Sequence, residues 1–128
     1  MNKDNIIQEI DSLNRTLEFI QEEQSFIKSK LSSFLDKVVL TDSLIWAETL
    51  HQEILNRESA IQLLKNDISK LSLELKTKYF ANNIIDALVL AEFKKFKQQV
   101  GYIEIQFLAW KQSTNEKFES AIYLILIE

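Results

Sequence analysis

The chain contains no proline, no cysteine and a single glycine, Gly101, and each shortage excludes a class of structure. Folds with many strands need turn residues at many positions, so all-β and α/β architectures are disfavoured. The lack of cysteine excludes disulfide bonds, thiol catalysis and cysteine-ligated metals, and it fits a reducing, cytoplasmic location. Long helices are therefore the favoured structure for 128 residues of which 46% are hydrophobic.

Long apolar runs and an excess of one charge sign are also missing. The longest apolar run, Ala121 to Ile127, is far shorter than the roughly 20 residues that a membrane-spanning helix needs. The net charge is only -4, and the charges are mixed along the chain. We therefore expect no membrane span and no nucleic-acid partner. The basic and aromatic stretch from Phe93 to Lys97 does not change this, because Phe93 and Phe96 belong to a helical apolar pattern.

Two short polar breaks interrupt the helical pattern. The first is near Thr41 and Asp42, either of which can cap a following helix. The second is at Asn82 and Asn83, where Asp86 follows as in a capping box. The breaks predict a single domain, residues 1–128, made of three helices that cover roughly residues 4–39, 42–80 and 84–126.

The first two predicted helices carry matching seams of apolar residues. In both helices these residues recur at alternating intervals of three and four, which is the heptad pattern of coiled coils. Folding the chain back at residues 40–41 brings residues whose numbers add to 81 to the same level, and the two seams then match position by position. The first seam consists of Ile6, Ile10, Leu13, Leu17, Ile20, Gln24, Ile27, Leu31, Phe34 and Val38, and the second of Ala47, Leu50, Ile54, Arg57, Ile61, Leu64, Ile68, Leu71 and Leu75.

The third helix repeats the match, with residue numbers that add to 164. Its seam consists of Val89, Phe93, Phe96, Val100, Ile103, Phe107 and Trp110. The sequence therefore predicts an elongated, all-α, antiparallel up-down-up bundle of three helices, each roughly 50–60 Å long. We call this matching of residues by the sum of their numbers level counting. It also places Phe118, and with it Ile122 and Ile125, against Trp46.

The C-terminal part of the third helix allows three interpretations. The seam becomes polar after Trp110, and Ser113 to Glu116 resemble a capping box, so the helix either continues through a stutter or breaks near residues 111–115 and restarts as a short fourth helix. The alternating stretch from Tyr102 to Trp110 is also typical of a strand, which leaves a C-terminal β-hairpin as the alternative.

The polar members of the first two seams fall at one level. We expect Gln24 and Arg57 to form a buried or half-buried polar layer that fixes the register of the helices. Arginine has five donors and no acceptor, so a carboxylate should join the layer, with Glu23 the first candidate and Glu104 the second. The alternative is that Arg57 extends along its own stem to solvent.

Apolar residues outside the seams predict a surface for association. They lie on all three helices at the middle of the bundle, and a belt of such residues is typical of a partner interface, although a wide core stripe is the alternative explanation. The predicted interface consists of Phe19, Phe26, Leu55, Tyr102, Ile105 and Ala109.

Residues that could carry out chemistry are few. Glu48 and His51 form a Glu-x-x-His pair of the kind that di-iron bundles use. The residues that level counting places opposite them, Lys30 to Ser33, include no carboxylate, and His51 is the only histidine. The general-base and nucleophile arrangements of enzymes are therefore nearly absent, and we expect no catalysis, no metal and no cofactor.

These features favour a non-enzymatic interaction or assembly protein. It would act by self-association, most simply as a homodimer, or by capture of a partner helix. The alternatives are a helical chaperone that holds an amphipathic client segment and, less favoured, a ligand- or metal-binding bundle.

Overall fold

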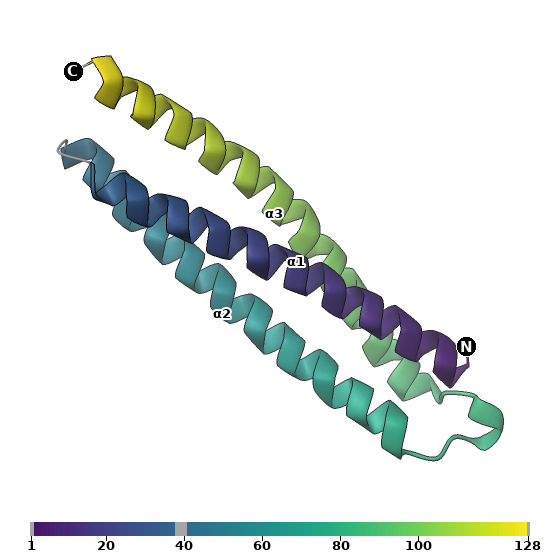
Figure 1. Ribbon diagram of the computed structural model, residues 1–128. Coiled ribbons are helices and arrows are strands. Elements are labelled where there is room, and N and C mark those ends of the chain that lie inside the picture. The colour runs from purple at the N-terminus through teal and green to yellow at the C-terminus, as the bar shows by residue number, and fades with distance from the viewer. Residues whose placement is uncertain (1, 38–40, 128) are drawn as a thin grey trace.

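The computed structural model describes residues 2–37 and 41–127, with side chains described for all of these except residue 41 and residues 123–127. Three long helices pack against one another, α1 (Lys3–Leu35), α2 (Thr41–Thr77) and α3 (Ala87–Ile127). Figure 1 shows α2 running back along α1 and α3 running back along α2, so that α1 and α3 are parallel. The predicted all-α up-down-up bundle is confirmed.

The predicted seams form the core. In α1 the eight buried residues are all members of the predicted seam, and the buried residues of α2 are seam members as well. In α3, Thr114, Phe118 and Ala121 are buried beyond the predicted seam, which ends at Trp110. The polar residue Gln24 is among them with only 1% of its surface exposed. Arg57, the polar member of the α2 seam, is half-buried. Burial of one apolar stripe per helix is what stabilises helices of this length in water.

Level counting correctly predicts which residues meet at one end of the bundle. The rings of Trp46 and Phe118 lie with their centroids 5.0 Å apart in an edge-to-face arrangement, and Phe34 contacts both rings. The prediction for Phe118 is therefore confirmed. Ile122 remains 42% exposed, and the side chain of Ile125 lies outside the described residues.

Charged pairs between α1 and α3 fit the same register. Glu9 pairs with Lys97 at 3.2 Å and Glu23 with Lys111 at 2.8 Å, and the partners are 88 positions apart in both pairs. Folding at the two predicted turns places each α1 residue level with the α3 residue 83 positions later. In parallel heptad helices, a charged residue that flanks the core of one helix contacts the residue five positions beyond its own level on the other helix, and such charges set orientation and register. This offset of five accounts for the separation of 88 positions in both pairs.

The connection between α2 and α3 is longer than the sequence predicts. Instead of ending at 80 and restarting at 84, the chain leaves α2 after Thr77, forms the short 3-10 helix η1 (Ala81–Asn83) and begins α3 at Ala87. Asn82 and Asn83 have φ angles of 55° and 58°, which asparagine tolerates better than most residues. They make the turn and do not cap the helix. Phe80 and Ile85, both buried, close this end of the core.

Helix α3 is continuous through residues 111–115, so the interpretation of a continuous helix with a stutter is confirmed, and the alternatives of a break with a short fourth helix and of a β-hairpin are wrong. The physical reason lies in Thr114, which is 4% exposed and occupies the core position after Trp110. Phe118 and Ala121 follow as buried residues. Two successive spacings of four are a stutter, which a coiled coil absorbs by local unwinding without a break.

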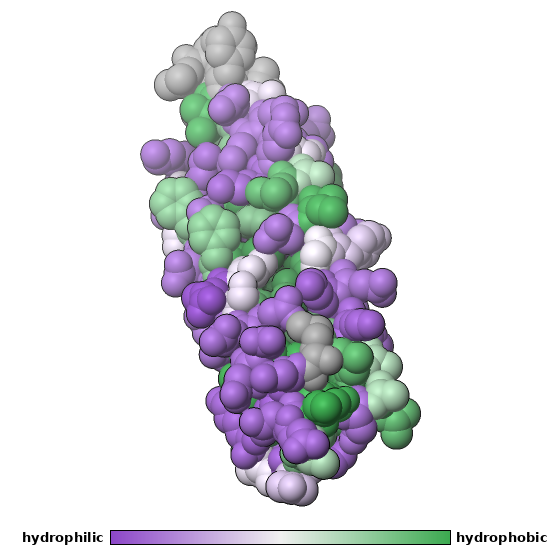
Figure 2. All heavy atoms as spheres, turned by 90° about the vertical axis from the view of Figure 1, so that its right-hand side faces the viewer, coloured by the Kyte–Doolittle hydropathy of each residue, from purple (hydrophilic) through white to green (hydrophobic). Residues whose placement is uncertain are grey.

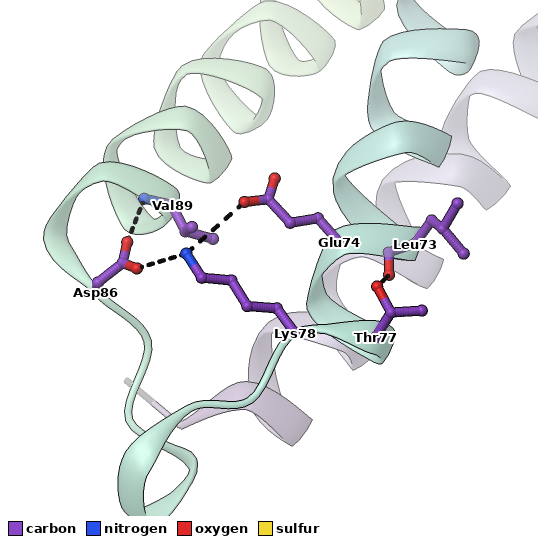
Figure 3. A network of polar contacts seen from close by, with 6 residues as sticks. All are labelled: Leu73, Glu74, Thr77, Lys78, Asp86 and Val89. Atoms are coloured by element: carbon purple, nitrogen blue, oxygen red, sulfur yellow. Dashed lines mark hydrogen bonds and ion pairs between the residues drawn. The ribbon is translucent and has the colours of Figure 1, made fainter.

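The start of α3 is held by the contacts drawn in Figure 3. The backbone amide of Val89 donates a hydrogen bond to the Asp86 carboxylate at 3.0 Å, which makes Asp86 the N-cap. Lys78 donates to the same carboxylate at 2.9 Å and lies 4.0 Å from Glu74 on the last turn of α2. The Asp86 carboxylate therefore connects the two helices that flank the connection.

We expect this N-cap to make the stability of the bundle sensitive to acid. The Val89 amide, and then Lys78, lower the pKa of Asp86. A lowered pKa in the folded chain contributes stability that is present above the ordinary carboxyl pKa, about 4, and is lost as pH falls through the folded value. Asp86→Asn keeps a capping side chain without the charge. In urea titrations followed by circular dichroism, the wild type should have a larger free energy of unfolding than this variant, and the difference should shrink below about pH 4. A difference that does not change with pH would contradict the assignment of the Asp86 carboxylate as the N-cap.

Candidate functional site

A pocket lies at the level of the predicted polar layer. Its volume is about 290 Å³, and all three helices contribute to its walls: Gln24 from α1, Glu53 and Arg57 from α2, and Gln106 from α3. The structure thus brings Gln24 and Arg57 to one place, as the seams predict. The fold achieves this because both residues occupy core positions of helices that pack in the predicted register.

Arg57 is positioned by an aromatic ring. Its guanidinium carbon lies 4.6 Å from the centre of the Trp110 ring, and the indole nitrogen of Trp110 donates a hydrogen bond to Glu53 at 3.0 Å. Burial lowers the pKa of Arg57, and the nearby Glu53 opposes that shift. Arginine remains cationic because its ordinary pKa is above about 12. A cation over an indole face contributes on the order of 0.5–2 kcal/mol.

The two carboxylates expected beside Arg57 lie elsewhere. Glu23 accepts a hydrogen bond from Lys111 at 2.8 Å, on the side of α1 that faces α3. Glu104 is exposed and lies seven residues from both Lys97 and Lys111, on the same side of α3 as those two lysines. Glu53, one turn before Arg57 on the same helix, is the carboxylate of this pocket.

Gln24 is the least satisfied polar group of the pocket. Both the nitrogen and the oxygen of its side-chain amide are buried, and neither has a hydrogen-bond partner among the described residues. An amide buried without partners costs about 1–3 kcal/mol relative to one that is hydrogen-bonded. Gln24 therefore lowers the free energy of unfolding relative to an apolar side chain at the same core position.

The chemistry available in this pocket is limited. An arginine, amide side chains and one carboxylate line it, together with apolar residues. An anionic ligand near Arg57 would meet the charge of Glu53 as well, which disfavours binding. Glu53 is the one carboxylate among the described lining residues, and no serine, cysteine, histidine or lysine lines the pocket beside it to form a nucleophile–base pair.

Glu48 and His51 are both exposed on the surface of α2. Within residues 2–37 and 41–127, no group of three or more histidine, aspartate or glutamate side chains is placed to hold a metal ion. The Glu-x-x-His spacing therefore lacks the further carboxylates that bundle metal sites use.

The residues of the predicted interface are exposed. Phe26 and Ile105 are each 70% exposed, and Phe19, Leu55, Tyr102 and Ala109 are exposed as well. Phe19 and Phe26 lie together beside Glu23 on α1, and Ile105 lies on α3 opposite the buried Phe107. On the face drawn in Figure 2, apolar side chains form separate groups with hydrophilic side chains between them.

Several exposed apolar residues were not in the predicted interface. Tyr79 is 87% exposed in the α2–α3 connection, and Leu63, Leu73 and Leu108 are more than half exposed on the helices. Their position outside the heptad seams is the signal that would have identified them. Scattered apolar residues are common on protein surfaces, so their grouping on one face carries more weight than their number.

Comparisons with known proteins place the chain in no family. No family model matches the sequence, and no solved structure matches it significantly. None of the described helices has an apolar stretch long enough to cross a membrane.

Proposed function

We propose that this bundle is a non-enzymatic interaction or assembly module that works through packing of its exposed helix faces. The observation that supports this proposal is the set of large apolar side chains that the packed bundle leaves exposed, with Phe26 and Ile105 as central examples. Exposed apolar groups on a folded chain favour association with another surface. A cytoplasmic location is part of the proposal and rests on the cysteine-free composition.

The hollow between α1 and α2 is poorly suited to hold an amphipathic client. A hollow of about 640 Å³ between α1 and α2 is lined entirely by polar side chains, among them Gln21, Lys28 and Glu58. An amphipathic client would need an apolar lining. The exposed apolar side chains instead project from convex helices, where a second helix can pack against them.

The test is the molar mass of the purified chain, followed by capture of partners. We expect light scattering to show association that increases with concentration, or a retained helical partner when the chain is immobilised in lysate from its native host. A variant with Phe26→Glu and Ile105→Glu is the matched control, because both side chains are exposed and the fold should tolerate the change. The proposal fails if the wild type is monomeric and retains nothing beyond what the variant retains.

A further inference from the structure

The side of α3 opposite the core forms one continuous exposed strip, which we name the outer face of α3. Its residues recur at intervals of three and four, as a heptad seam does, and all of them are exposed although they lie in the middle of a long helix. The outer face of α3 consists of Ala91, Lys94, Gln98, Gly101, Ile105, Ala109, Gln112, Glu116 and Glu119.

Gly101, the only glycine of the chain, lies on this face without a role inside the bundle. Its φ angle is not positive, and a Cβ atom at this position would meet nothing within 4 Å. Glycine destabilises the interior of a helix relative to alanine. Small residues on a helix face let a second backbone approach closely, and Ala109 lies two turns further along the same strip.

The outer face of α3 is complementary to itself when a second copy is turned end over end about Ile105. Gly101 then lies opposite Ala109 and Gln98 opposite Gln112, in each case of the other copy. Lys94 of each copy lies opposite Glu116 of the other, and Ala91 lies opposite Glu119, so each end of the interface holds one pair of opposite charges. Two copies of Ile105, which is 70% exposed, meet on the symmetry axis.

Other arrangements of two copies lack this complementarity. In a parallel pair Lys94 faces Lys94 and Glu116 faces Glu116, which is unfavourable at both ends. In an antiparallel pair displaced by one heptad, Lys94 faces Ala109 and Ile105 faces Gln98. The charges and sizes of the side chains therefore select one two-fold symmetric register.

Two larger side chains flank the strip and fit the same register. Tyr102 lies at one edge and Leu108 at the other, and both are more than half exposed. In the antiparallel pair Leu108 of one copy packs over Gly101 of the other, and Tyr102 packs over Ala109. A large residue over a small one on each side is the pattern of close helix packing.

From these observations we propose that the outer face of α3 is the contact surface of an antiparallel, two-fold symmetric homodimer. This inference rests on the proposed function, because it specifies self-association as the mode of interaction. The strip is roughly 40 Å long and about 10 Å wide. Roughly 400 Å² per copy is below the usual size of stable interfaces, so we expect a weak dimer that dissociates on dilution.

Charge exchange at the ends of the strip tests the proposal. Neither Lys94 nor Glu116 takes part in an ion pair within the described residues, so the fold should tolerate changes at both. Lys94→Glu or Glu116→Lys alone should weaken dimerisation about ten-fold, because each creates two like-charge contacts per dimer. An equal mixture of the two variants should form heterodimers, and the chain with both changes should form homodimers again, because opposite charges then face each other.

The measurement is sedimentation equilibrium at protein concentrations from about 1 μM to about 1 mM. Lys70→Glu, an exposed charge reversal on α2, should leave the dissociation constant unchanged. Ile105→Glu should abolish the dimer, because it places two carboxylates on the symmetry axis. Circular dichroism should show the same helix content in every variant.

The outcomes separate this inference from the proposed function. If the chain dimerises and Phe26→Glu breaks the dimer while the charge exchanges do not, the outer face of α3 is the wrong surface, and self-association still stands. If the chain stays monomeric at every concentration, the homodimer is excluded, and the proposed function then depends on partner capture alone. Recovery of association only in the mixture or the double variant would establish the antiparallel register.

Discussion

Replacing Phe118 with alanine is expected to lower the free energy of unfolding by about 3–5 kcal/mol. Phe118 is fully buried and packs edge to face against Trp46 and Phe34, with ring centroids 5.0 and 5.8 Å away. The nitrogen of Lys30 lies 4.9 Å from its ring centre. Phe34 and Lys30 belong to α1 and Trp46 belongs to α2, so the change removes the contact by which α3 closes one end of the bundle.

Urea denaturation measures this effect, and the melting temperature should fall by roughly 10–20 °C for a chain of this size. Phe26→Ala is the matched control, because it removes the same ring from a position that is 70% exposed, and it should change stability by less than about 0.5 kcal/mol. In a Trp110→Phe background, the fluorescence of Trp46 should shift to the red when Phe118 is removed. Equal effects of the two phenylalanine changes would mean that α3 does not pack there.

The meeting of Trp46 and Phe118 shows how much of this fold is encoded in spacing. Heptad seams determine which stripe of each helix is buried, and the positions at which the chain reverses determine the level at which residues face each other. The position of Phe118 follows from these two facts, although it lies 72 positions after Trp46 in the sequence. The length of the α2–α3 connection did not follow, because Asn82 and Asn83 form a turn of positive φ in place of a cap.

Level counting is less informative about the ends of long side chains. It places Arg57 beside Phe107, but helical side chains lean toward the N-terminus of their own helix. The Arg57 guanidinium therefore reaches the level of Ile54 and Glu53, where Trp110 lies beneath it. Glu23 was expected beside Arg57 on level alone, yet its side of α1 faces Lys111. Level gives the height of a residue along the bundle and leaves open the direction in which its side chain points.

Gln24→Leu is expected to raise the free energy of unfolding by about 1–2 kcal/mol. The sequence alone predicts the opposite, because it treats Gln24 as a partner that Arg57 would lose. In the structure the Arg57 guanidinium lies over Trp110, and the amide of Gln24 is buried with no partner among the described residues. Leucine is similar in size to glutamine and removes the unsatisfied amide without leaving a cavity.

A double-mutant cycle decides between the two interpretations. If Arg57 and Gln24 do not bond to each other, the effects of Gln24→Leu and Arg57→Leu on the free energy of unfolding should add to within about 0.5 kcal/mol. Gln24→Ala is the control for packing: it removes the same amide but leaves a hole, so it should be less stable than Gln24→Leu. A destabilised Gln24→Leu variant, together with a coupling above about 1 kcal/mol, would show that the two side chains form one polar layer. In that case Gln24 would contribute to stability. The arrangement in the structure indicates the opposite: Gln24 is a core residue that lowers stability, as buried polar residues that fix the register of coiled coils do.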